Sequence, residues 1–402
     1  MRENSQQELV NAKPHREAWR PGDVTRIENG VVELVVRKEG GHFAEFQFSG
    51  SSGAPSPNVL WESAWRHEKL ASASPEDLAK TAGFTGHGLC LDYFGSPSTT
   101  EAARGFVQHG EAARALWEPA PGATSALGMA RWSIRLPVAQ LDLERSVRLG
   151  RGESVAFIEE TVTDLCGVDH ICDWVQHATF GPPFATHEDT SFIASATRGL
   201  TAPDGYGADS LVASNLEFEW PFAPAESRQS EMVDLGRPYA VRGKGITAAV
   251  QMDPRRSVQF IAAINRKYRL GVGYCFRRED FPWMMVWEEN CVRADRPWHG
   301  TAQARGMEFG STPLPSGREA TLRRGPLFET PSWCTIPAMG SKTARYLMFL
   351  FWVPDDCDGI TDVVARGDAI DFSGENGQFA FSIPAHGCEE FLSASRATSI
   401  EG

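Results

Sequence analysis

The 402-residue sequence has no hydrophobic run long enough to cross a bilayer as a helix. Its most apolar stretch, Tyr346 to Val353, is far shorter than the roughly 20 residues that a spanning helix needs, so we expect a buried strand there. The first residues also have no apolar core and no small-residue cleavage site, as a signal peptide would. We therefore expect no membrane association and a cytoplasmic location.

An excess of positive charge is also missing. Lys and Arg total 39 against 52 Asp and Glu, which gives a formal net charge of −13. Nucleic acid is excluded as an expected partner because phosphate binding needs a clustered positive field. The eight cysteines include no Cys-x-x-Cys pair, so we expect buried free thiols and no disulfide framework.

Several catalytic motifs are absent as well. The sequence has no Gly-x-Ser-x-Gly of a serine hydrolase, no Gly-rich dinucleotide fingerprint after a strand, and no phosphate-binding Gly-x-x-x-x-Gly-Lys. It has no His-x-His and no His-Glu-x-x-His, and no Cys stands at ligand spacing from a His. We therefore expect neither a cofactor nor a bound metal.

What the sequence does contain is a series of short segments with period-two alternation. Glycine-rich turns separate residues 31–37 from 42–48 and residues 141–149 from 155–162, which predicts two antiparallel hairpins. Short strands divided by Gly, Pro, Asp and Ser indicate a sandwich or barrel. Further strands are expected at 216–220, 258–264, 270–276, 283–287, 305–309 and 378–383.

Helix signals are few. Residues 74–82 and 98–105 could each form a short helix, and neither recurs at the interval of a βαβ unit. We therefore predict an all-β protein with large antiparallel sheets and few short helices. No convincing linker interrupts the strand pattern, so we expect one domain over residues 1–402, with residues 1–20 and 392–402 peripheral to it.

Two adjacent carboxylate pairs occur, Glu159-Glu160 and Glu288-Glu289. Neighbours in a strand point to opposite faces, so neither pair forms an acid/base dyad by itself. We expect at least one member of each pair to be a surface charge.

The candidates among the ten histidines are four that lie beside glycine or in a strand-like setting rich in aromatic residues: His42, His87, His109 and His177. Histidine titrates near neutral pH and suits proton transfer. Taken singly, each is more often a hydrogen-bonded structural residue than a catalyst.

Taken together, several segments resemble the aldose 1-epimerase (galactose mutarotase-like) family. Their order and spacing add weight to motifs that are each only moderately specific. The segments are Gly40-Gly41-His42, Asn58-Val-Leu-Trp61-Glu, Gln108-His109-Gly110-Glu111, residues 159–184, and Gly306-Met-Glu308-Phe-Gly.

The resemblance implies a single β-supersandwich and an isomerase that interconverts the α and β anomers of an aldose without a cofactor. By resemblance, Glu308 is the base that takes the proton of the C1 hydroxyl, and His177 is the acid that protonates the ring oxygen. His109 would hold the ring oxygen or a neighbouring hydroxyl. The expected partner is a small-molecule carbohydrate, bound by a monomer or a homodimer.

Four other residues are expected to contact the substrate. Asp234 is the candidate for the family's sugar-binding Asp, and Trp287 offers a flat apolar face for a sugar ring. Arg305 could meet an acidic or phosphorylated sugar, and His87 lies in a glycine-rich segment near the other motifs.

The sequence also departs from the family pattern. The family's second-histidine motif commonly reads His-x-Tyr-Phe-Asn, whereas here residues 177–181 read His-Ala-Thr-Phe-Gly. This difference leaves the substrate open. Two alternatives remain: a non-catalytic carbohydrate-binding or sensor protein, and another carbohydrate-active enzyme, such as a lyase, on the same fold.

Overall fold

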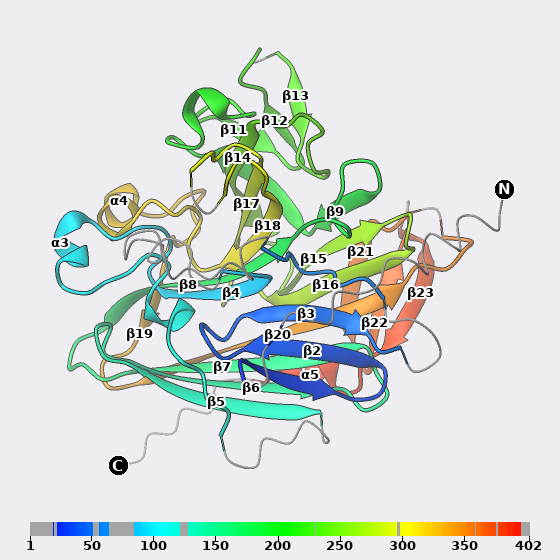
Figure 1. Cartoon of the computed structure of the whole chain (residues 1–402), viewed down its shortest axis with the longest axis horizontal. Helices are drawn as coiled ribbons and strands as arrows, with labels where there is room; N and C mark the ends of the chain where they lie inside the picture. The colour runs from blue at the N-terminus through cyan, green and yellow to red at the C-terminus, as the bar shows by residue number, and fades with distance from the viewer. Residues whose placement is uncertain are drawn as a thin grey trace.

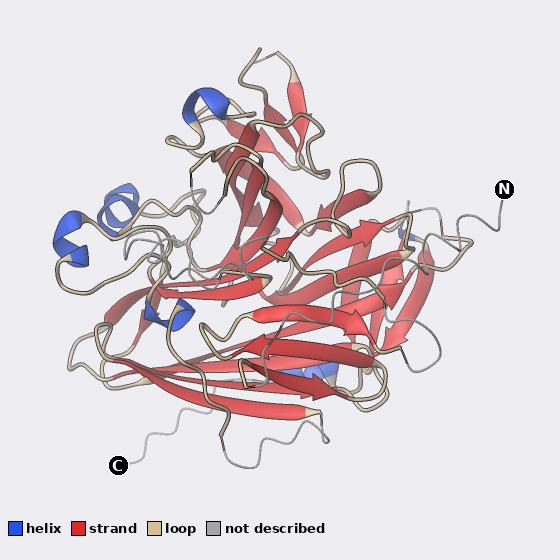
Figure 2. Cartoon of the chain, in the orientation of Figure 1, coloured by secondary structure: helices blue, strands red, loops and turns tan. Residues whose placement is uncertain are grey.

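The computed structural model describes residues 19, 22–50, 56–63, 84–120, 128–228, 230–295, 298–357, 359–374 and 377–394. These residues form antiparallel sheets with few short helices, so the predicted all-β class is confirmed (Figure 2). The helix predicted at 74–82 lies outside the described residues. In the part of the chain that is described, no helix is long and apolar enough to cross a membrane.

The largest sheet has its strands in the order β1-β2-β3-β4-β8-β18-β17-β14-β10-β11-β12-β13, and β19 pairs with one end of β8. The bounds are β1 (Val24–Glu28), β2 (Val32–Arg37), β3 (Phe43–Phe48), β4 (His87–Asp92), β8 (His170–Phe180), β10 (Ala196–Thr201), β11 (Glu217–Glu219), β12 (Phe222–Pro224), β13 (Met232–Asp234), β14 (Lys244–Met252), β17 (Trp283–Asn290), β18 (Gln303–Gly310) and β19 (Cys334–Ile336). We call it the first sheet.

The second sheet has the order β5-β6-β7-β20-β16-β15-β9, and a small third sheet has the order β21-β22-β23 (Figure 1). Their strands are β5 (Met129–Leu136), β6 (Leu141–Leu149), β7 (Val155–Asp164), β9 (Thr190–Ala194), β15 (Val258–Asn265), β16 (Leu270–Arg277), β20 (Ser341–Trp352), β21 (Asp362–Arg366), β22 (Ala369–Ser373) and β23 (Phe379–Pro384). The helices are α3 (Thr99–Ala102), η3 (Glu111–Ala113), η5 (Gly207–Asp209), α4 (Arg318–Arg324) and α5 (Cys388–Ser393).

Both predicted hairpins are confirmed: β2 pairs with β3, and β6 pairs with β7, each antiparallel. The apolar run that begins at Tyr346 is part of β20, a central strand of the second sheet. Ser98 caps α3, although the helix is shorter than predicted. The sequence reading did not foresee α4 and α5, and the eight cysteines are free thiols.

The main core lies between the first and second sheets, where alternate residues of each strand are buried. In β6, every second residue from Leu141 to Leu149 is buried, as the alternation predicts. A second apolar cluster lies between the second sheet and the third sheet with α5. A third cluster, which includes Trp61, Met285 and Trp287, covers the opposite face of the first sheet.

A polar network crosses the main core. Arg145 on β6 and Glu160 on β7 form a fully buried ion pair, with Nε and Nη2 of Arg145 each 2.7 Å from Oε1 of Glu160. The other oxygen of Glu160 accepts hydrogen bonds from Trp174 Nε1 and Gln176 Nε2 on β8, at 2.9 and 2.7 Å. The second sheet is thereby tied to the middle of the first.

Removing the Glu160 carboxylate should therefore cost far more stability than removing its neighbour. Glu160→Ala leaves Arg145 buried without a counter-charge, a defect that typically costs about 3–5 kcal/mol. Glu159, paired with Arg345 and 37% exposed, is the matched control, and Glu159→Ala should cost less than about 1 kcal/mol. Denaturant titration of both variants measures the difference, and equal losses would contradict the role assigned to this network.

Candidate functional site

One row of residues runs across the middle of the first sheet on the face turned away from the main core. Gly88 on β4 lies opposite His177 on β8, and Met285 on β17 lies opposite Glu308 on β18. The strands β8 and β18 pair in the same register before and after this row, with Gly306 opposite Thr179 and Phe309 opposite Gln176. This register places Glu308 beside His177. Residues distant in sequence thus meet because of strand pairing.

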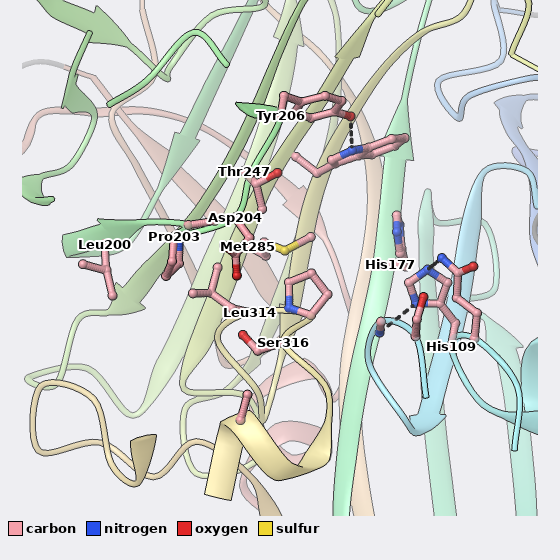
Figure 3. A pocket seen from close by; sticks show the side chains of 18 of the residues that line it. His109, His177, Leu200, Pro203, Asp204, Tyr206, Thr247, Met285, Leu314 and Ser316 are labelled. Carbon is pink, nitrogen blue, oxygen red and sulfur yellow. Dashed lines mark hydrogen bonds between the residues drawn. The ribbon is translucent and has the colours of Figure 1, made fainter. Parts of the chain in front are cut away.

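Two residues of this row, His177 and Met285, line a cavity of about 1100 Å³. Figure 3 shows His177 and His109 close together on one side of it, Leu200 and Pro203 on the other, and Ser316 near α4. The cavity size is typical of ligand sites and exceeds what a single hexose fills.

Glu308 and His177 are in direct contact. Oε1 of Glu308 is 3.2 Å from Nε2 of His177, and the two side chains are 0% and 6% exposed. The carboxyl group folds back along its own strand over Gly306, where a Cβ atom would stand only 2.4 Å from Oε1. Glycine at 306 therefore provides the space that the carboxyl group occupies.

The hydrogen bonds around His177 indicate where its proton lies. The Thr179 hydroxyl donates to the carbonyl oxygen of His177 at 3.3 Å, so its oxygen is free to accept from Nδ1–H of the same ring at 3.0 Å. In a neutral imidazole this leaves Nε2 as an acceptor facing Glu308.

The pKa shifts agree with that arrangement. Burial raises the pKa of Glu308 well above its usual value, and burial lowers the pKa of His177 well below its usual value, helped by the neighbouring His109. The pair in the free protein is therefore a protonated carboxyl group in contact with a neutral imidazole, and among the described residues neither Glu308 oxygen has a hydrogen-bond partner.

His109 reaches the cavity from the segment that follows β4. It has a left-handed backbone, with φ of 62°, and the next residue, Gly110, approaches β4 so closely that a Cβ atom would lie 1.8 Å from the Leu91 carbonyl oxygen. Glycine at 110 is thus a local requirement of this turn. The turn places the His109 ring 5.6 Å from the His177 ring, edge to face.

His109 is also neutral. Burial, with Arg114 and Arg293 nearby, lowers the pKa of His109 to about 4. Its Nδ1 accepts weakly from the Gly95 N–H at 3.4 Å, and its Nε2 lies 3.3 Å from Nε2 of the Gln108 side chain. Both ring nitrogens are therefore already in contact with protein groups, and the ring presents a neutral imidazole at the cavity wall.

Trp287 lines the cavity as expected, and so do Tyr206 and Arg293, which the sequence did not mark as candidates. The Trp287 indole donates to the Tyr206 hydroxyl at 2.7 Å, and this hydroxyl donates to Glu289 at 3.1 Å. The Arg293 guanidinium lies 4.7 Å from the Trp298 ring centroid and 3.4 Å from a Glu289 oxygen. Tyr206 and Arg293 come from loops, and no periodic pattern marks them.

Three of the predicted substrate contacts do not line this cavity. His87 lies on the opposite face of β4 from Gly88, buried between the sheets, where its ring contacts Gln176 and Tyr274. Asp234 is exposed on β13.

Arg305 is also turned away from Glu308, because an odd number of positions separates them on β18. It forms a buried ion pair with Glu288, 2.5 Å apart, and contributes to a different hollow beside His187.

The expectation of a surface charge at Glu288 or Glu289 was wrong, since both are buried. They lie in β17, an inner strand of the first sheet, and each has its own partners. Glu288 faces Arg305, and Glu289 accepts from the backbone N–H groups of Val292 and Arg293. The pair at 159–160 follows the expectation, with Glu159 half-exposed. In the described chain, no three His, Cys, Asp or Glu side chains gather closely enough to hold a metal ion.

Comparison with known proteins supports the fold. No protein-family model and no curated protein matches the sequence. Solved structures do match: a galactose mutarotase-like protein from Clostridium acetobutylicum has a TM-score of 0.54 at 13% identity, over 82% of this chain and 95% of that one. A galactose mutarotase related enzyme from Lactobacillus acidophilus has a TM-score of 0.53 at 12% identity, over 83% and 98%.

A GalM/aldose epimerase homologue from C. elegans matches with a TM-score of 0.52 at 10% identity, over 82% of this chain and 99% of that chain. Identities this low show the fold alone. The chain has the galactose mutarotase-like sandwich fold that the sequence motifs predicted.

The raised pKa of Glu308 makes stability depend on pH. Above about pH 4.5, its ordinary pKa, an unfolded Glu308 loses its proton while the folded carboxyl group keeps it, so stability falls as pH rises. Glu308→Gln removes this loss because an amide of the same shape has no proton to release in either state. The variant should therefore become progressively more stable than the wild type above pH 4.5.

The advantage of Glu308→Gln should grow by up to about tenfold in the folding equilibrium for each pH unit, until the pKa of the folded carboxyl group is reached. Thermal denaturation of both proteins from pH 4.5 to 8 measures it, since the contribution of His177 is common to both. A stability difference that does not change with pH would show that Glu308 is ionised in the folded protein.

Proposed function

We propose that this protein is an isomerase that interconverts the anomers of an aldose by acid/base ring opening. The observation that carries the proposal is the His177–Glu308 contact, in which His177 lines a large cavity and Glu308 lies buried behind it, with the pKa of the acid raised and that of the imidazole lowered. Groups whose environments move their pKa values in these directions hold a proton donor and a proton acceptor side by side near neutral pH.

In this state the imidazole is the base and the carboxyl group is the acid. His177 Nε2 takes the proton of the C1 hydroxyl, Glu308 gives its proton to the ring oxygen, and the C1–O bond of the ring breaks to leave an open-chain aldehyde. Rotation about C1–C2 and reversal of both transfers close the ring on the other face. This order of roles is opposite to the one implied by the family resemblance.

Ring opening requires the sugar to lie between the two groups, with its C1 hydroxyl at Nε2 and its ring oxygen at the carboxyl group. His109 adds a neutral imidazole beside His177, and Trp287 offers an aromatic surface to the ring. None of these steps needs a metal or an organic cofactor.

A second function, non-catalytic sugar binding, is favoured by one observation. The Glu308 side chain is 0% exposed and contributes no surface to the cavity, so a sugar reaches it only by separating the His177–Glu308 contact. A protein that only binds sugar would keep the cavity and its aromatic lining without ever opening that contact.

The two functions predict different rates of exchange between the anomers of a sugar. One-dimensional exchange NMR on a panel of aldoses should show equilibration above the buffer rate for at least one sugar. Glu308→Gln and His177→Gln should each lower the enzyme-catalysed rate about 10²- to 10⁴-fold, the usual contribution of a general acid or base. Glu390→Gln, an exposed change on α5, is the matched control.

If every sugar equilibrates at the buffer rate in the wild type while one or more still bind, the isomerase proposal fails and the binding function stands.

The space at Gly306 gives an independent test of geometry. In Gly306→Ala, the new methyl group would overlap the present position of the Glu308 carboxyl group, which must then move relative to His177. Misplacing a reacting group by about 1 Å can reduce catalysis on the order of 10²-fold. Gly167→Ala, at an exposed glycine with open space around it, is the control. Unchanged exchange rates in Gly306→Ala with an intact circular dichroism spectrum would contradict the role of Glu308.

A further inference from the structure

Arg324, in the last turn of α4, contributes its side chain to the wall of the cavity. Its Nη2 donates to the Ser316 hydroxyl at 2.8 Å. Its Nη1 is buried and has no hydrogen-bond partner. A guanidinium normally directs five N–H groups at acceptors, so this one is only partly used.

The charge of Arg324 is also uncompensated. The two nearby arginines have carboxylate partners: Arg293 is 3.4 Å from Glu289, and Arg318 pairs with Asp92. Among the described residues, no carboxylate oxygen lies within ion-pair distance of Arg324. Burial lowers the pKa of this guanidinium, which reflects the cost of withdrawing a cation from water without an anion beside it.

The negative charges of the cavity do not neutralise Arg324. Asp204 and Asp295 contribute to the cavity lining, and neither forms an ion pair with it. Asp173, which lies near enough to influence the pKa of Arg324, is already held by the Phe94 N–H and the Thr312 hydroxyl. An anion that meets this guanidinium must therefore come from a ligand.

Arg324 is linked to the wall that carries His109. Its partner Ser316 forms a backbone bridge with Gly95, and the His109 N–H donates to the Gly95 carbonyl oxygen at 3.0 Å. Figure 3 shows Ser316 near α4, with His177 and His109 to its right, and all three residues line the cavity. One ligand of the size that the cavity admits can reach both the histidines and this guanidinium.

We propose that the sugar bound in this cavity carries an anionic group, a carboxylate or a phosphate, which Arg324 binds with the Ser316 hydroxyl beside it. This inference rests on the proposed function in that the ligand is a sugar. Arginine suits the task because its planar fork of donors matches both oxyanions and stays charged. The neutral histidines then handle the proton chemistry while Arg324 selects the substrate.

The test measures binding and catalysis separately. Dissociation constants for glucose, glucuronate and glucose 6-phosphate are determined by isothermal titration calorimetry with the wild type, Arg324→Gln and Arg323→Gln. Arg323 is the matched control because it is the neighbouring helical arginine, is 79% exposed and pairs with Glu319.

The wild type and Arg323→Gln should bind at least one of the two anionic sugars about 10- to 100-fold more tightly than glucose, the range expected for charge-assisted hydrogen bonds. Arg324→Gln should reduce that preference to less than about threefold. Preference for glucuronate identifies a carboxylate as the recognised group, and preference for glucose 6-phosphate identifies a phosphate.

Equal affinities for all three sugars, or an anionic preference that survives Arg324→Gln, would overturn the proposal. Exchange NMR on the same samples keeps it distinct from the proposed function. An anionic preference without accelerated exchange overturns the isomerase activity and leaves Arg324 as a binding residue. Accelerated exchange with equal affinities overturns only the role of Arg324.

Discussion

The burial of Glu160 is the constraint on which the arrangement of this protein depends. A carboxylate that is fully removed from water must be paired and hydrogen-bonded on all sides. Here Arg145 comes from the second sheet, while Trp174 and Gln176 come from β8 of the first. These donors reach one carboxylate only in a single registration of the two sheets, so the network specifies how the layers meet.

The registration of the two sheets also determines which side chains face the cavity. Gln176 must point into the core to reach Glu160, and the period of two in a strand then turns His177 to the opposite face. The same alternation turns Gly88 to the face that carries His177 and His87 into the core, where its Nε2 contacts Gln176. A slip of one residue in β8 would exchange the catalytic candidate for a core residue.

Much of this could be predicted from the sequence, and what failed did so for identifiable reasons. Alternation located the hairpins and strands, and motif order brought His109, His177 and Glu308 to one place. Arg305 was wrongly expected to contact the substrate. It lies three positions from Glu308 on β18, so its side chain points to the opposite face of the sheet.

The positions of His87 and Asp234 depend on how their strands pair, and no local sequence pattern specifies that pairing. Arg293 and Arg324 lie in a loop and at a helix end, and only the folded structure brings them to the cavity.

Desolvation connects substrate binding to proton transfer in this site. The pKa of Glu308 is raised, and that of His177 lowered, chiefly because water is excluded. A sugar that fills the cavity removes more water and so favours the same neutral pair further. The negative charge of an acidic sugar acts on the pair too, but Arg324 offsets it at the wall. Placing the anion on a guanidinium therefore lets an acidic substrate bind without protonating the imidazole that must act as the base.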